Sequence, residues 1–411
     1  MPGHKWIFKS RFRANAYGWK ATALATKRLK EAVSEIKKVS KSNPVTGAEG
    51  AVSLMERIWP SLQGIDGSSG SLGNAVNRTL EALIPLVIDA PADNKTRSKW
   101  LERLFEAVQV DGVNYLSPVE DRWGELCGGD ELAKEWVNRL LPIVEEFWTQ
   151  ENVFGSWVHG QSICLSCLLA TKRFEELQQL LSKKSHQFWA FDKFWAQALA
   201  EQGEVDAAVE FAESCRSRLG SYDDPSIVAF CEQTLVDAGR ASEAYQTYAM
   251  QSSQATTHLA TFRQIARRYP ELDSREILQD LIRTHPPKGK WFAAAKHADC
   301  LEVALECADY ISAEPNTLIR AARDFLSKEP SFAAEVALCA IKNLLAGGGY
   351  EPTRLDVMQA HQHLIDSASA CGREEWADEG LEQLIVAGAV RGREEFLEAL
   401  VLERTRAAQN R

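Results

Sequence analysis

Basic and aromatic side chains alternate over the first twenty residues, and together they have the chemistry to bind an anion. Lysine and arginine pair with phosphate groups, and aromatic rings stack on unpaired bases. The candidate binding residues are Lys5, Trp6, Lys9, Arg11, Phe12, Arg13, Tyr17, Trp19 and Lys20. This set predicts a site for a protein partner or for nucleic acid. Two further interpretations stay open: the rings pack on the chain's own body while the cations pair with its excess acid, or the segment is a targeting signal.

The charge of this segment is opposite in sign to that of the rest of the chain. Residues 1–41 contain 11 Lys/Arg and two Glu, a net charge of +9, whereas the whole chain carries −10. The remainder is therefore at −19. Such a remainder repels nucleic acid, and it also offers the basic segment a landing site on its own chain.

Glycine recurs every third residue between Gly64 and Gly73, just before an expected helix. Backbone N–H groups at a helix N-terminus can bind an anion, and Ser71 or Asn74 is the expected cap. The loop lacks the Gly-Lys-Ser/Thr ending of a Walker motif. An ordinary flexible connection is therefore the favoured interpretation.

Cys164 and Cys167, with His159 nearby, form the group whose residue types best suit a metal. Zinc requires three or four converging ligands, and the apolar residues around the cysteines favour a buried helix instead. His361 and His363 are two residues apart, so they point to different faces of a helix. We therefore expect no metal site.

A pair of adjacent acids and one basic turn are the remaining candidates for a catalytic or binding role. Glu120 and Asp121 stand beside Arg122 in a polar stretch, but nothing around them selects a general acid or base. The segment 285–292, HPPKGKWF, offers a second contact point for phosphate or a partner, or is a loop that leads Trp291 into the core. We predict no catalytic residue and no cofactor.

Helical periodicity dominates the elements that must position these residues, and strand-like alternation is scarce. In the first 150 residues the pattern predicts helices over 20–39, 48–62, 74–88 with a kink at Pro85, 94–109 and 131–149. Residues 1–19 read as irregular.

A repeat begins near residue 155. Gly203 and Gly239 are 36 residues apart, and so are Ala208 and Ala244. Each unit reads as a helix, a glycine in the left-handed conformation and a second helix whose small residues allow close approach. An earlier unit around 168–174 lacks the glycine, and later units around 295–308, 333–345 and 371–384 are degenerate.

These residues resemble the tetratricopeptide class of helical-hairpin repeats, with a period near 34. The resemblance implies an α-solenoid. The whole chain is also similar to a group of uncharacterised bacterial proteins with a helical-repeat C-terminal half, through the stretches GSSGSLGNAVN (67–77) and KWLERLFEAV (99–108). That second resemblance implies a bacterial cytosolic setting and brings no activity with it.

The sequence therefore predicts an all-α protein. Its parts are a basic aromatic arm with an amphipathic helix (1–41), an N-terminal helical region (42–150) and a helical-repeat region (151–411). Nine cysteines, an odd number, indicate a reducing compartment, and no apolar run approaches the roughly 20 residues of a membrane span. We expect a cytoplasmic, non-enzymatic scaffold that binds a protein or peptide partner, or alternatively a nucleic-acid-binding protein of a bacterial regulatory or defence system that uses the arm.

Overall fold

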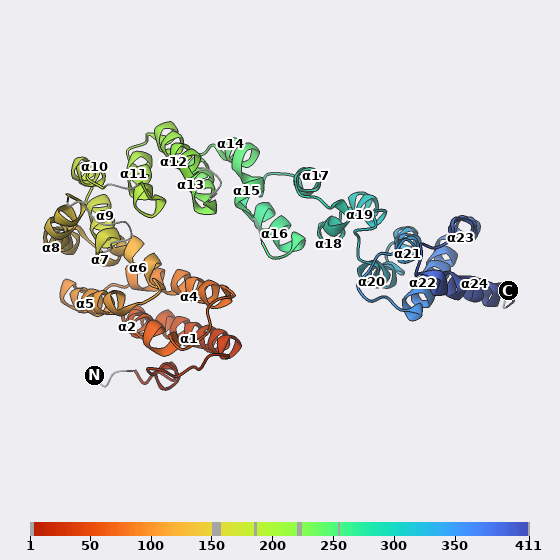
Figure 1. Cartoon of the computed structure of the whole chain (residues 1–411), viewed down its shortest axis with the longest axis horizontal. Coiled ribbons are helices and arrows are strands. Elements are labelled where there is room, and N and C mark those ends of the chain that lie inside the picture. Colours follow the sequence, from red (N-terminus) through yellow and green to blue (C-terminus); the bar gives the residue numbers. More distant parts are fainter. Residues whose placement is uncertain (1–3, 150–157, 185–186, 220–223, 254, 410–411) are drawn as a thin grey trace. The chain divides into compact units, whose positions relative to one another are not determined.

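The protein is all-helical. The computed structural model describes residues 4–149, 158–184, 187–219, 224–253 and 255–409, and this part of the chain contains no strand (Figure 1). Its contacts separate it into two compact units, Met1–Ile227 and Val228–Arg411. The division predicted at residues 150–151 lies outside the described residues.

The first unit consists of helices joined by short connections. Its elements are η1 (Phe8–Ser10), α1 (Thr22–Ser42), α2 (Pro44–Met55), α3 (Ile58–Leu62), α4 (Ser71–Ile88), α5 (Asn94–Val110), α6 (Ser117–Asp121), α7 (Trp123–Cys127), α8 (Asp130–Thr149), α9 (Gln161–Ala170), α10 (Phe174–Ser182), α11 (Trp189–Glu201) and α12 (Val205–Leu219). The helix α13 (Pro225–Asp237) contains the division between the units.

The second unit has the same character. Its elements are α14 (Ala241–Ala244), the π-helical turn η2 (Tyr245–Ala249), α15 (Met250–Ser252), α16 (His258–Arg268), α17 (Ser274–Thr284), η3 (Lys288–Trp291), α18 (Phe292–His297), α19 (Leu301–Ala308), α20 (Pro315–Phe325), α21 (Pro330–Leu345), α22 (Arg354–Cys371), α23 (Glu374–Ala387) and α24 (Glu394–Gln409).

Amphipathic spacing explains how α1 packs. A buried stripe at helical intervals faces α2 and α4, and its members are Ala25, Leu29, Ala32 and Ile36. The helix ends at Asn43, whose side chain accepts a hydrogen bond from the Thr46 amide at 2.9 Å and so caps α2. The helix predicted over 20–39 is thus confirmed, with later bounds.

The helix predicted over 48–62 is in fact two helices, α2 and α3, which separate at Glu56 and Arg57. Pro60 gives the physical reason, because in a continuous helix its ring would clash with the carbonyl of Glu56 four residues earlier. In contrast, α4 continues through Pro85 to Ile88.

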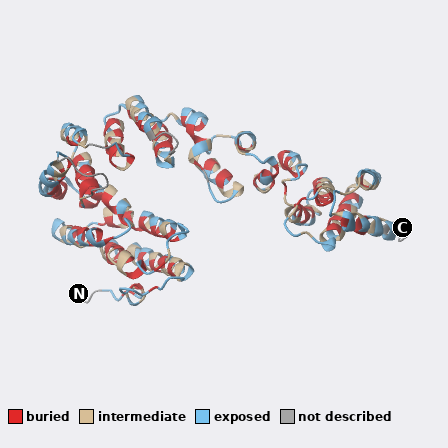
Figure 2. Cartoon of the chain, viewed as in Figure 1, coloured by how far each residue is buried: buried red, intermediate tan, exposed pale blue. Residues whose placement is uncertain are grey.

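Aromatic side chains form the centre of the first unit's core. The rings of Trp123 and Trp136 meet edge to face with centroids 5.1 Å apart, and Phe105 lies 5.0 Å from Trp136. Buried positions recur along one side of many helices (Figure 2). The apolar core of this unit runs from Trp6 in the arm to Ala198 in α11.

The two glycines of the predicted repeat have the conformation that the pattern requires. Gly203 has a φ of +82° after α11, and Gly239 has a φ of +76° after α13. Ala208 and Ala244 are fully buried in the helices that follow. The second of these helices departs from the expected form, because the π-helical turn from Tyr245 interrupts it.

Candidate binding surfaces

The N-terminal arm, residues 4–21, is fastened to the first unit by backbone hydrogen bonds. The Glu35 carboxylate of α1 accepts the amides of Ile7 at 2.7 Å and Phe8 at 3.2 Å. Further along, the Asn15 amide donates to the carbonyl of Pro60 at 2.8 Å. The arm therefore follows one defined path over α1 and α3.

Four of the five aromatic side chains in the arm are buried in the core: Trp6, Phe8, Phe12 and Tyr17. Gly50 of α2 makes room for the indole of Trp6, because a Cβ there would stand 2.3 Å from Trp6 Cζ2. Trp19 is the exception, with 67% of its surface exposed. Of the interpretations left open for the arm, packing on the chain's own body is therefore the one that holds for these four rings.

Among the residues that the structure describes, the cations of the basic segment form no salt bridge with the acidic remainder of the chain. In the described residues, Arg11 and Arg28 form salt bridges with Glu31, which itself belongs to residues 1–41. The other cations of the candidate set are exposed or half-buried: Lys5, Lys9, Arg13 and Lys20. A binding role for the exposed members of the set, Trp19 included, stays a prediction.

The glycine-rich loop before α4 lacks the side-chain cap that the sequence suggested. The N-cap residue is Gly70, with a φ of +68°, and no side chain bonds the first turn from that position. Ser71 and Asn74 both lie inside the helix. The residue before the helix has a left-handed conformation, which glycine adopts without strain. The Ser71 amide donates to Ser69 Oγ at 3.4 Å.

The cysteine and histidine candidates lie in different environments. Cys164 and Cys167 are fully buried in α9, as the apolar pattern predicted, and burial raises the pKa of the Cys164 thiol to about 12. His159 is exposed. His361 is buried with its Nε2 unpartnered among the described residues, and burial lowers the pKa of its imidazole.

Glu120 is more deeply buried than its polar surroundings in the sequence indicated. Its side chain is 5% exposed, and its Oε2 has no hydrogen-bond partner in the part of the chain described. Burial, followed by the negative charges of Asp121 and Asp111, raises the pKa of its carboxyl to about 8. Lys193 pairs instead with Asp121 at 2.5 Å. A neutral carboxyl at this place is the arrangement that costs least.

In the segment 285–292 the aromatic residues enter the core. Trp291 and Phe292 are 1% and 2% exposed, and the indole N–H of Trp291 donates to the carbonyl of His285 at 2.8 Å. Lys288 stays exposed, and its Nζ lies 5.3 Å from the ring centroid of Tyr310.

Sequence reasoning missed a surface in the second unit that we call the two-loop platform. It consists of the loops 309–314 and 346–353, which follow α19 and α21. Three large apolar side chains stand exposed on these loops: Tyr310 at 45%, Ile311 at 55% and Tyr350 at 80%. The signal that could have found them is the pair of apolar residues just after a helix, with Tyr350 just after three glycines.

A buried amide holds the first loop of the platform against α21. Asn343 is 1% exposed, and its Nδ2 donates to the carbonyls of Ala308 at 3.1 Å, Tyr310 at 3.1 Å and Ala313 at 3.4 Å. The second loop joins the first through the Tyr350 amide, which lies 3.4 Å from Glu314 Oε1. Fixed loops present these side chains at a low entropic cost of binding.

No family model matches the chain, and no curated protein matches it either. Within the described residues no helix is both long enough and apolar enough to cross a membrane.

Proposed function

We propose that this protein is a non-enzymatic helical-repeat scaffold, of the tetratricopeptide-like class, that binds a protein or peptide partner. The two-loop platform is the observation that carries the proposal. Exposed tyrosine and isoleucine side chains on rigid loops are the anchors that protein interfaces use. Singly exposed apolar residues are common, whereas here three of them lie on two loops that a hydrogen bond joins.

The packing of the second unit supports a repeat architecture. Consecutive helices contact one another in the pairs α18–α19, α20–α21 and α21–α22. Stacked helical hairpins of this kind present surfaces that bind peptides and domains. The proposal also includes a cytoplasmic location in a bacterium, which rests on the cysteine usage and on the resemblance described above.

Charged groups contact the loops of the platform. Lys342 pairs with Asp309 at 2.5 Å, and the Arg393 guanidinium donates to the carbonyl of Gly347 at 3.2 Å. Lys288 lies beside Tyr310, with 3.3 Å between its Nζ and the phenol oxygen. Polar groups at the rim of an apolar centre are typical of a specific interface.

Affinity purification of the full-length protein under mild salt tests this function. The double variant Ile311→Ala and Tyr350→Ala should lose a specific partner that the wild type retains, by tenfold or more in recovered amount. The matched control is Val401→Ala with Leu402→Ala, which removes exposed apolar side chains from α24 instead. Equal recovery with both double variants, or no partner in any tagged configuration, would contradict the proposal.

A further inference from the structure

The helix α1 has three faces with different chemistry. One is the buried apolar stripe, and a second carries Glu31 and Glu35, which hold the arm. The third face, which we call the lysine face, consists of Lys27, Lys30, Lys37, Lys38 and Lys41. At 100° per residue these five positions fall within about a third of the helix circumference, opposite the buried stripe.

Every lysine of this face is exposed, and none forms a salt bridge within the described ranges. The two acids of the helix are already engaged: Glu31 by Arg11 and Arg28, and Glu35 by backbone amides of the arm. Five like charges along about 21 Å of helix repel one another. A polyanion that lies along the face would relieve this repulsion.

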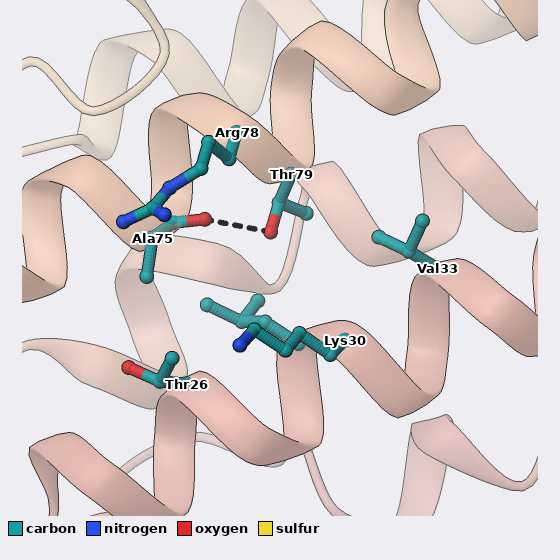
Figure 3. Close-up of a pocket in the computed structure, with 7 residues that line it drawn as sticks. Thr26, Lys30, Val33, Ala75, Arg78 and Thr79 are labelled. Atoms are coloured by element: carbon teal, nitrogen blue, oxygen red, sulfur yellow. Dashed lines mark hydrogen bonds between the residues drawn. The ribbon is translucent and has the colours of Figure 1, made fainter. Parts of the chain in front are cut away.

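The positive surface continues onto α4. Lys30 and Arg78 extend in the same direction over a groove of about 200 Å³ between α1 and α4 (Figure 3). The Arg78 Nε donates to the carbonyl of Asn74 at 3.1 Å, and in the described part of the chain the terminal nitrogens of its guanidinium form no salt bridge. Leu29 and Val33 give the groove an apolar floor. Two cations over an apolar floor suit a phosphate that is attached to a flat ring.

Trp19 supplies an aromatic platform at the N-terminal end of the same helix. Its backbone is fixed by the Asp66 amide, which donates to the Trp19 carbonyl at 3.0 Å, yet its side chain is 67% exposed. The exposed Lys20 follows it directly. A solvent-facing indole beside cations, on a backbone that is held in place, is an arrangement that can stack an unpaired base.

We infer that the lysine face, with Arg78 and Trp19, binds single-stranded nucleic acid through its phosphates. The row from Lys27 to Lys41 spans about six phosphate spacings of one strand. An acidic polypeptide would pair with the same lysines, but it has no base to stack on the exposed indole of Trp19. The acidic remainder of the chain restricts binding to this one face.

Fluorescence anisotropy with full-length protein tests the inference. The probes are a labelled 20-nucleotide single strand of mixed sequence, the corresponding duplex and a labelled poly-glutamate peptide, at salt concentrations from 50 to 300 mM. The log of the single-strand association constant should fall with the log of salt at a slope of about −3, since four or five phosphates are neutralised. The variant Lys30→Ala, Lys37→Ala and Lys41→Ala should reduce that slope by about 2 and lower affinity at least tenfold at 100 mM salt.

Two controls separate this site from general charge. The variant Lys95→Ala with Lys99→Ala removes exposed cations from α5, outside the face, and should leave binding unchanged. Trp19→Ala should weaken single-strand binding at least fivefold and leave duplex binding unaltered. The inference is overturned if the α5 variant loses as much affinity as the lysine-face variant, or if poly-glutamate binds as tightly as the single strand. The platform variants lie in the other unit. The nucleic-acid inference and the proposed scaffold function can therefore be refuted independently of each other.

Discussion

Replacing Glu120 by glutamine should stabilise the protein at pH 8.5 and change its stability little at pH 5. Glu120 is 5% exposed, its Oε2 lacks a partner in the described structure, and burial raises the pKa of its carboxyl from 4.5 to about 8. Below pH 4.5 the carboxyl is protonated in both the folded and the unfolded state. Between pH 4.5 and 8 the folded state holds a proton that the unfolded state has lost, so the free energy of unfolding falls as pH rises.

The size of the effect follows from the span between the two pKa values. Each pH unit costs about 1.4 kcal/mol, so the full span from 4.5 to 8 corresponds to about 5 kcal/mol as an upper limit. Relaxation of the site lowers this value, and a buried amide has its own desolvation cost. We therefore expect a net gain of about 2 kcal/mol for Glu120→Gln at pH 8.5. This gain raises Tm by about 4–8 °C for a unit of this size.

Thermal unfolding of the full-length protein, followed by tryptophan fluorescence at pH 5, 7 and 8.5, measures this difference. The matched control is Glu125→Gln on the neighbouring helix α7. Unlike Glu120, the Glu125 side chain is half-exposed and forms a salt bridge with Arg122 at 2.6 Å. The control should show a small Tm change that does not grow with pH. A Glu120→Gln variant whose Tm change is the same at pH 5 and pH 8.5 would refute the reasoning, because its carboxyl would then not titrate in this range.

Three further predictions follow from particular positions. Gly203→Ala should cost about 1–2 kcal/mol, because Gly203 has a φ of +82°, whereas Gly73→Ala, inside α4 with no atom within 4 Å of the added Cβ, should stabilise by about 0.5–1 kcal/mol; urea unfolding compares the two. Gly50→Ala places a Cβ 2.3 Å from Trp6 Cζ2, so we expect a loss of about 1–3 kcal/mol and faster tryptic cleavage of the arm, and unchanged cleavage would argue against the docked path of the arm. Burial lowers the pKa of His361 below 6.5, so stability should fall as pH drops through 6.5, and His361→Leu should flatten that acid limb in thermal scans between pH 7 and 5.

The parts of the fold that the sequence could predict are those that depend on local periodicity. The apolar stripe of α1 and the turn at Gly203 are visible within one or two helical turns, and both stand as predicted. The wealth of aromatic residues in the arm likewise indicated packing, which four of the rings confirm.

The features that could not be predicted depend on contacts between distant segments. Asn343 is a polar residue in an apolar helix, and its role is visible only when carbonyls 30 to 35 residues earlier come within reach. Glu120 lies in a polar stretch that reads as a surface loop, and it becomes buried because α6 packs against α4 and α9. Single-segment patterns carry no information on either arrangement.

The charge of the first 41 residues and their docking are separate properties. The arm is held by buried rings and by Glu31 and Glu35, and the cation of the arm that takes part is Arg11. The lysine face contributes no salt bridge to the described fold, and its mutual repulsion opposes the folded state. Packing therefore accounts for four of the five aromatic rings, whereas the five lysines stay exposed, and Lys27 makes only a minor contribution to the lowered pKa of Glu31. Much of the positive charge of residues 1–41 therefore lies on the helix α1 and not on the irregular arm. Of the five aromatic rings of the arm, Trp19 is the one that is exposed beside this helix.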